Sequence, residues 1–251
     1  MELRSEPRYE DQLTWGPRSK QWLAWQPDGQ YVLFALGSLG GDKHIYRTMS
    51  DGSGGVETVL SSDDQEWMGS FCRDGRYLAY SRSPKNPVNP SIWVLPLTGD
   101  RRPFPLVQAQ FANFRPVFSP DCKWIAYNSN APGRTEVYLT NFPDATRRHQ
   151  VSAQGGGDAH WRGDGKELFY LSRKQGNIMA VDVEESGVEI SLGNPRTLFH
   201  LGNISFISSS VLSRFEVTSD GRRFLIVTSN QPPRPVPLTV VTNWDAELKK
   251  R

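Results

Sequence analysis

The chain has 251 residues, with 29 Lys+Arg against 27 Asp+Glu and a formal net charge of +2. This near-balance argues against a nucleic-acid-binding protein, which needs a concentrated basic face. Hydrophobic residues make up 37% of the chain, enough for a packed core. No apolar run approaches the roughly 20 residues that a membrane-spanning helix requires, so we expect no membrane insertion.

One phrase recurs five times along the chain: an aromatic residue or Val, two further residues, Asp, usually Gly, and a β-rich run. The copies are WQPDGQYVLF at 25–34, FCRDGRYLAY at 71–80, FSPDCKWIAY at 118–127, WRGDGKELFY at 161–170 and VTSDGRRFLI at 217–226. Their aspartates are successively 46, 47, 43 and 56 residues apart. A repeat of roughly 40–50 residues with strand-like content is typical of a β-propeller blade.

Each repeat divides into four predicted strands. An inner strand ends at the Asp-Gly turn, and a second strand leaves that turn with alternating apolar residues, the pattern of a β-hairpin. Third strands are predicted at 44–49, 91–97, 136–142, 177–183 and 237–244, and fourth strands at 56–62, 104–110, 148–154 and 196–201. The sequence therefore predicts an all-β fold built from four-stranded antiparallel blades.

We expect a single β-propeller domain over residues 1–251. Its repeats span approximately 17–62, 63–110, 111–154, 155–201 and 202–251. Five blades are preferred, and the alternative is an incomplete six-bladed ring. The fifth repeat lacks a fourth strand, so we expect the segment 10–16 to close the last blade as its outer strand, which removes exposed sheet edges and favours a monomer. The long final spacing between turn aspartates, 56 residues, predicts an insertion around 186–210.

Three stretches of the chain resemble one known family. They are FSPDCKWIAYNSNAPGRTEVYLTNFPD at 118–144, WRGDGKELFYLS at 161–172 and FEVTSDGRRFLIVTSN at 215–230. They look like the TolB-like β-propeller family, in particular the WD-repeat-like propeller that ends many bacterial serine/threonine kinase-like proteins. The resemblance extends over roughly residues 22–244 and implies a fold and a sensing or protein-binding role. No kinase motif is present, so kinase activity is not expected.

The residue types that commonly serve in catalysis or metal binding do not occur here at the spacings of known motifs. We expect each turn aspartate to accept backbone N–H bonds in its own turn. The four histidines lack metal-ligand spacing, and no Gly-x-Ser-x-Gly nucleophile motif occurs. We therefore predict no catalytic residue, no metal and no cofactor. Cys72 and Cys122 lie in neighbouring repeats, and the sequence leaves open whether they form a disulfide.

One column of residues is a candidate binding site. Six residues before each turn Asp, where the inner strands should open onto the central funnel, stand Trp22, Met68, Arg115, Asp158 and Arg214. His160 follows Asp158 on the same predicted strand. Arginines, an acid and large apolar groups form the mixture expected of a recognition site. The alternative is a solvated rim without a ligand.

The predicted function is a non-catalytic binding module that recognises a protein or peptide through the funnel face, as the sensor or interaction part of a kinase-type signalling system. One alternative is a glycan-active lyase or hydrolase using funnel Arg, Asp and His side chains. Another is a functionless remnant of a larger kinase–propeller protein. Residues 1–12 contain no apolar stretch of a signal peptide, so the chain as written is expected in the cytoplasm. A fragment of a longer membrane protein would place it in the periplasm.

Overall fold

The computed structural model describes residues 14, 19–37, 44–84, 89–187, 189–201, 215–226 and 239–242. These residues form strands β1 to β20 and contain no helix. Accordingly, the described part of the chain holds no helix long and apolar enough to cross a membrane.

The strands form five antiparallel sheets, one in each predicted repeat. The first has the order β1(Ser19–Trp25), β2(Tyr31–Gly37), β3(His44–Met49), β4(Glu57–Leu60). The second has the order β5(Gln65–Phe71), β6(Tyr77–Ser83), β7(Ser91–Pro96), β8(Phe104–Val107). The third has the order β9(Asn113–Phe118), β10(Trp124–Ser129), β11(Glu136–Asn141), β12(Arg148–Gln150).

The last two sheets depart from the simple four-strand pattern. The fourth contains β13(Gly157–Trp161), β14(Glu167–Ser172), β15(Asn177–Ser186), β16(Glu189–Leu192) and β17(Arg196–His200), with both β16 and β17 paired to β15. The fifth contains β18(Phe215–Val217), β19(Arg223–Ile226) and β20(Thr239–Thr242). The long last step between turn aspartates, from Asp164 to Asp220, is thus explained in part by an extra hairpin in the fourth repeat, in which β15 runs on to Ser186 and pairs with β16.

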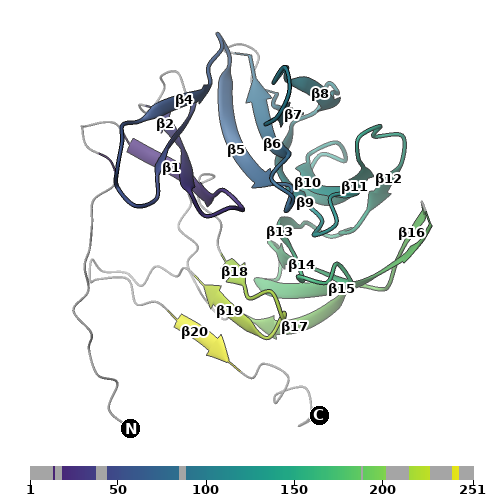
Figure 1. Ribbon diagram of the computed structural model, residues 1–251. Helices are drawn as coiled ribbons and strands as arrows, with labels where there is room; N and C mark the ends of the chain where they lie inside the picture. Colours follow the sequence, from purple (N-terminus) through teal and green to yellow (C-terminus); the bar gives the residue numbers. More distant parts are fainter. Residues whose placement is uncertain are drawn as a thin grey trace, which may run out of the picture.

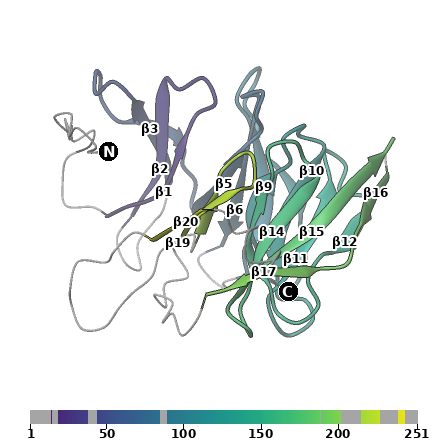
Figure 2. The same cartoon turned by 90° about the horizontal axis from the view of Figure 1, so that it is seen from below.

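The sheets follow one another around a common centre (Figure 1). The first strand of each sheet lies innermost, and β5 contacts β1 and β9 while β13 contacts β9 and β18. The view turned by 90° shows strands of neighbouring sheets running alongside one another (Figure 2). This arrangement confirms the predicted all-β propeller architecture. The number of blades in the ring stays a prediction, and residues 10–16, predicted to close it, lie outside the described residues except for Thr14.

The turn aspartates have the structural role that the sequence predicts. Each accepts a backbone N–H bond from the residue two positions later, at 2.9–3.1 Å, in the turns of Asp28, Asp74, Asp121, Asp164 and Asp220. The residue directly after each turn aspartate has positive φ, and it is Gly in four of the five turns. Cys122 takes this place in the third turn with φ of 64°, at a strain cost of about 1–2 kcal/mol.

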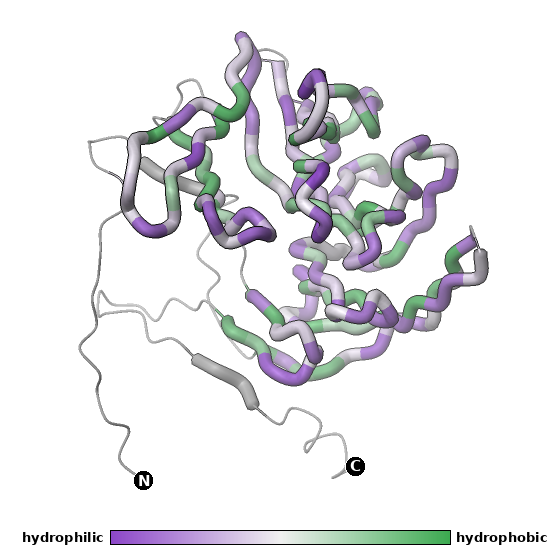
Figure 3. Tube along the Cα trace, in the orientation of Figure 1, coloured by the Kyte–Doolittle hydropathy of each residue, from purple (hydrophilic) through white to green (hydrophobic). Residues whose placement is uncertain are grey.

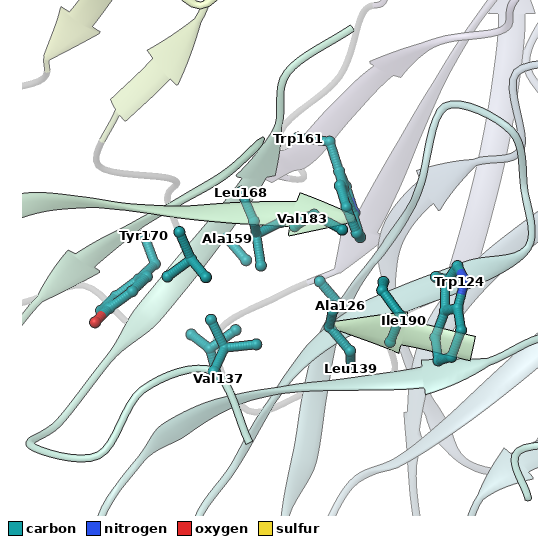
Figure 4. Packing of buried hydrophobic residues seen from close by; sticks show 12 residues of the cluster. Trp124, Ala126, Val137, Leu139, Ala159, Trp161, Leu168, Tyr170, Val183 and Ile190 are labelled. Carbon is teal, nitrogen blue, oxygen red and sulfur yellow. The ribbon is translucent and has the colours of Figure 1, made fainter. Parts of the chain in front are cut away.

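The core lies between consecutive sheets, where apolar side chains of one sheet meet those of the next. Hydrophobic stretches run through the interior of the sheets (Figure 3), and the second strands β10 and β14 are buried along their whole length. Trp161 of β13 packs on residues of the third sheet, among them Trp124 and Ala126 (Figure 4). Phe71 and Phe118 pack in the same way on the sheet that precedes each of them.

Trp25 and Trp161 open equivalent copies of the repeated motif, so both would be expected in the core, and for Trp25 this expectation is wrong. Its side chain is 61% exposed, whereas Trp161 is 8% exposed. The inner-strand aromatic residue packs on the sheet before its own. In a closed ring the sheet before the first would be the fifth, and no hydrophobic cluster of the described residues joins these two sheets.

Candidate binding site in the central funnel

A cavity of about 330 Å³ lies where the five inner strands meet. Every sheet contributes to its lining, which consists of Trp22, Leu23, Met68, Gly69, Arg115, Pro116, Val117, Asp158, Ala159, His160 and Glu216. The structure therefore brings together five of the six predicted site residues, four from the repeat column and His160. The sixth, Arg214, lies outside the described residues. Leu23 and Glu216 were missed because they stand at other offsets from the turn.

Three residues of the column have a strained backbone. Trp22, Arg115 and Asp158 have φ of 60°, 57° and 55°, in the left-handed region that non-glycine residues rarely adopt. Each lies where the pairing of its inner strand with the next strand shifts register, as in a β-bulge. Bulges re-aim side chains, and strain of this kind gathers at functional sites. The sequence gives no sign of the positive φ, because none of the three is Gly or Asn.

Arg115 lies against both of the other strained residues and so links three sheets. The Arg115 guanidinium donates to the Asp158 carboxylate in a close ion pair, and its Cζ lies 5.2 Å from the centre of the Trp22 ring. The Asp158 side chain is fully buried, and that of Arg115 is 13% exposed. Among the described residues, Asp158 Oδ2 and Trp22 Nε1 are buried and have no hydrogen-bond partner. The floor of the funnel is thus a buried ion pair with unused hydrogen-bonding capacity.

Gly69 sets how closely two inner strands approach. A Cβ at this position would lie within 3.0 Å of the Pro116 carbonyl oxygen, the Pro116 ring and the Ala79 carbonyl oxygen. Only a glycine allows β5 to run this close to β9, so the shape of the cavity depends on it.

His160 is held as a neutral imidazole. Burial, and secondly the nearby Arg115 charge, lower its pKa from 6.5 to about 4. Its ring packs 4.5 Å from that of Phe215, and its Nδ1 lies 3.5 Å from a Glu216 carboxylate oxygen, too far for a good hydrogen bond. At neutral pH this side chain offers a ligand an uncharged donor or acceptor.

We expect an NMR titration of the imidazole carbons to show His160 uncharged at pH 5, with a midpoint near 4. The signal is assigned by its loss in the His160→Gln variant. Since the folded-state pKa is below that of the unfolded chain, protonation favours unfolding as the pH falls from about 6.5 toward 4. A midpoint close to 6.5 in the folded protein would contradict this environment.

The described residues contain one cluster of potential metal ligands, formed by Cys72, Asp74 and Cys122. The two cysteines form a disulfide with each other, which joins neighbouring sheets. The pairing that the sequence left open is therefore present, and the two sulfur atoms are not available as thiolate ligands.

No protein-family model matches the chain, and no curated protein matches it in sequence. Solved structures do match it in fold. TolB from Acinetobacter baumannii superposes with a TM-score of 0.65 at 16% identity, over 90% of this chain and 52% of that one. A Mycobacterium tuberculosis puromycin-hydrolyzing peptidase gives 0.57 at 14% identity, over 89% of this chain and 36% of the peptidase.

The β-propeller domain of Cps50 (Swd1) from Myceliophteria thermophila gives a TM-score of 0.53 at 14% identity, over 89% of this chain and 73% of that one. The chain thus spans about half the length of the TolB that it matches and about a third of the peptidase. At these identities the likeness concerns the fold. The chain has a β-propeller fold similar to the folds of these proteins.

Proposed function

We propose that the chain is a non-catalytic binding module that recognises a protein or peptide through the central funnel. One observation carries this proposal: a single cavity collects side chains from all five inner strands. At its edge Leu23 is 68% exposed, and at its floor lies the buried Arg115–Asp158 pair. An exposed apolar group beside buried polar groups is the arrangement by which an interface gains both desolvated area and specificity.

The lining gives little support to catalysis. The described residues around the cavity include no Ser, Thr, Cys, Lys or Tyr that could act as a nucleophile. The Asp158 carboxylate is engaged by Arg115, and the lowered pKa of His160 makes it a weak general base at neutral pH.

The rival proposal is an enzyme that acts on a glycan. It is supported by the convergence of Asp158, His160 and Glu216 on one cavity. The similarity to a peptidase does not strengthen it, because the match covers only 36% of that chain. The kinase-linked role and the monomeric state stay predictions.

The test compares two variants that make the same chemical change. Leu23→Glu places a carboxylate at the edge of the funnel, and Val56→Glu places one on a side chain that is 49% exposed, outside the cavity. A partner captured from native lysate with the wild-type protein is purified, and its affinity for each variant is measured. We expect Leu23→Glu to weaken binding at least about tenfold, because the new charge loses its water on complex formation.

Val56→Glu is expected to bind like the wild-type protein, and equal thermal midpoints establish that both variants are folded. A partner that binds Leu23→Glu as tightly as wild type contradicts recognition through the funnel. Turnover of a glycan by the wild-type protein, lost in Asp158→Asn, would favour the enzyme instead.

A further inference from the structure

A second recess lies outside the funnel, between the third and fourth sheets. It measures about 380 Å³ and is lined by Arg134, Thr135, Gln154, Gly155, Arg173 and Lys174. These residues come from the segments that precede β11 and β13 and from the turn between β14 and β15 (Figure 1). We call this recess the basic groove.

The groove carries an excess of positive charge. Three of its six lining residues are cationic, and none is acidic. The Glu136 carboxylate beside Arg134 is buried and already accepts hydrogen bonds from Arg134 Nε at 2.6 Å, Ser152 Oγ at 2.5 Å and the Gly155 N–H at 2.9 Å. It offsets the charge of Arg134. Lys174 is exposed and forms no ion pair within the described part of the chain.

The glycine run 155–157 opens the groove to an extended ligand. Gly155 has φ of 91°, and a Cβ there would meet no atom within 4 Å, so the space above its backbone is free. At Gly157 a Cβ would lie 3.1 Å from Arg173 Nε and 3.2 Å from Nη2. The Arg173 guanidinium therefore lies close over this backbone, one residue from Asp158 of the funnel floor.

We propose that the basic groove binds the carboxylates of an acidic peptide segment. An Arg fork suits the planar carboxylate, and Lys adds a mobile point charge. A recess with three cations and one compensating buried carboxylate matches a short acidic segment, whereas a nucleic-acid backbone needs a broad basic face. The proposal rests on the proposed function only in taking the ligand to be a peptide.

The test uses end-blocked, fluorescein-labelled oligoglutamate and oligoglutamine peptides of equal length, followed by fluorescence anisotropy. We expect oligoglutamate to bind the wild-type protein, to be weakened by added salt, and to bind more tightly than oligoglutamine. The Lys174→Glu substitution is expected to weaken oligoglutamate binding about tenfold or more, because it replaces a positive charge beside the peptide carboxylates with a negative one.

Lys166→Glu is the matched control. Lys166 is also an exposed lysine of the fourth sheet, but it stands in the Asp164 turn, at the other end of the sheet. Equal oligoglutamate affinity of wild type and Lys174→Glu would overturn the proposal, as would failure of oligoglutamate to bind the wild-type protein. A labelled oligothymidylate serves as the nucleic-acid probe, and tighter binding of it than of oligoglutamate would also overturn the proposal. Because Leu23→Glu leaves the groove intact, its loss of the captured partner reports on the funnel alone, and the two proposals fail separately.

Discussion

Replacing Gly69 by Ala is expected to lower the free energy of unfolding by about 3 kcal/mol or more, the upper end of the effect of overpacking. The new Cβ would lie 2.6 Å from Pro116 Cγ and 2.8 Å from the Ala79 carbonyl oxygen, and closer still to the Pro116 carbonyl oxygen. Two of these contacts are with backbone, so no rotamer change relieves them. Urea unfolding followed by tryptophan fluorescence measures the loss.

Two glycines separate this clash from other effects of a methyl group. Gly55 has ordinary φ and free space, so Gly55→Ala is expected to change the free energy of unfolding by less than about 0.5 kcal/mol. Gly29 also has free space but φ of 72°, so Gly29→Ala isolates the backbone strain, about 1–2 kcal/mol. If Gly69→Ala proves no more costly than Gly29→Ala, β5 and β9 do not approach as closely as described.

The same clash has a consequence for the funnel. Gly69 and Pro116 both line the cavity, and they belong to neighbouring inner strands. Any relaxation that accommodates a methyl group must move these strands apart beside Arg115. A folded Gly69→Ala protein is therefore expected to have an altered binding surface even though no side chain that could contact a ligand has been changed.

The strands could be predicted from the sequence because every repeat contains the same residue pattern. The Asp turns, the alternating apolar residues and the spacing of the copies together defined most strands to within one or two residues, as for 136–142 against β11. The candidate site followed from the same regularity. Residues at equal offsets from the turn occupy equivalent places in every sheet, so one column of residues converges where the sheets converge.

Features that depend on one particular contact could not be predicted from the sequence. The pairing of Arg115 with Asp158 joins residues of different repeats, and nothing in either repeat requires the other. The exposure of Trp25 depends on the place of its sheet in the chain, although its motif is the same as that of Trp161. The basic groove could not be predicted because its cations come from separate turns, and nothing in the sequence indicates that these turns lie side by side.

Removing the Cys72–Cys122 disulfide is expected to lower the free energy of unfolding by about 4 kcal/mol. The bond joins residues 50 positions apart, one directly after β5 and the other in the turn between β9 and β10. Cross-linking a loop of this length restricts the unfolded chain strongly, and it also ties the second sheet to the third. The measurement is urea unfolding of the wild-type protein with and without reductant and of the double variant Cys72→Ala/Cys122→Ala.

Alanine is chosen at position 72 because the side chain is fully buried, and a serine hydroxyl there would add its own desolvation cost. At position 122, where φ is 64°, Cys122→Gly in place of Cys122→Ala should restore about 1 kcal/mol by relieving backbone strain. Unchanged stability in reductant, with both thiols shown by alkylation to be free, would contradict the prediction.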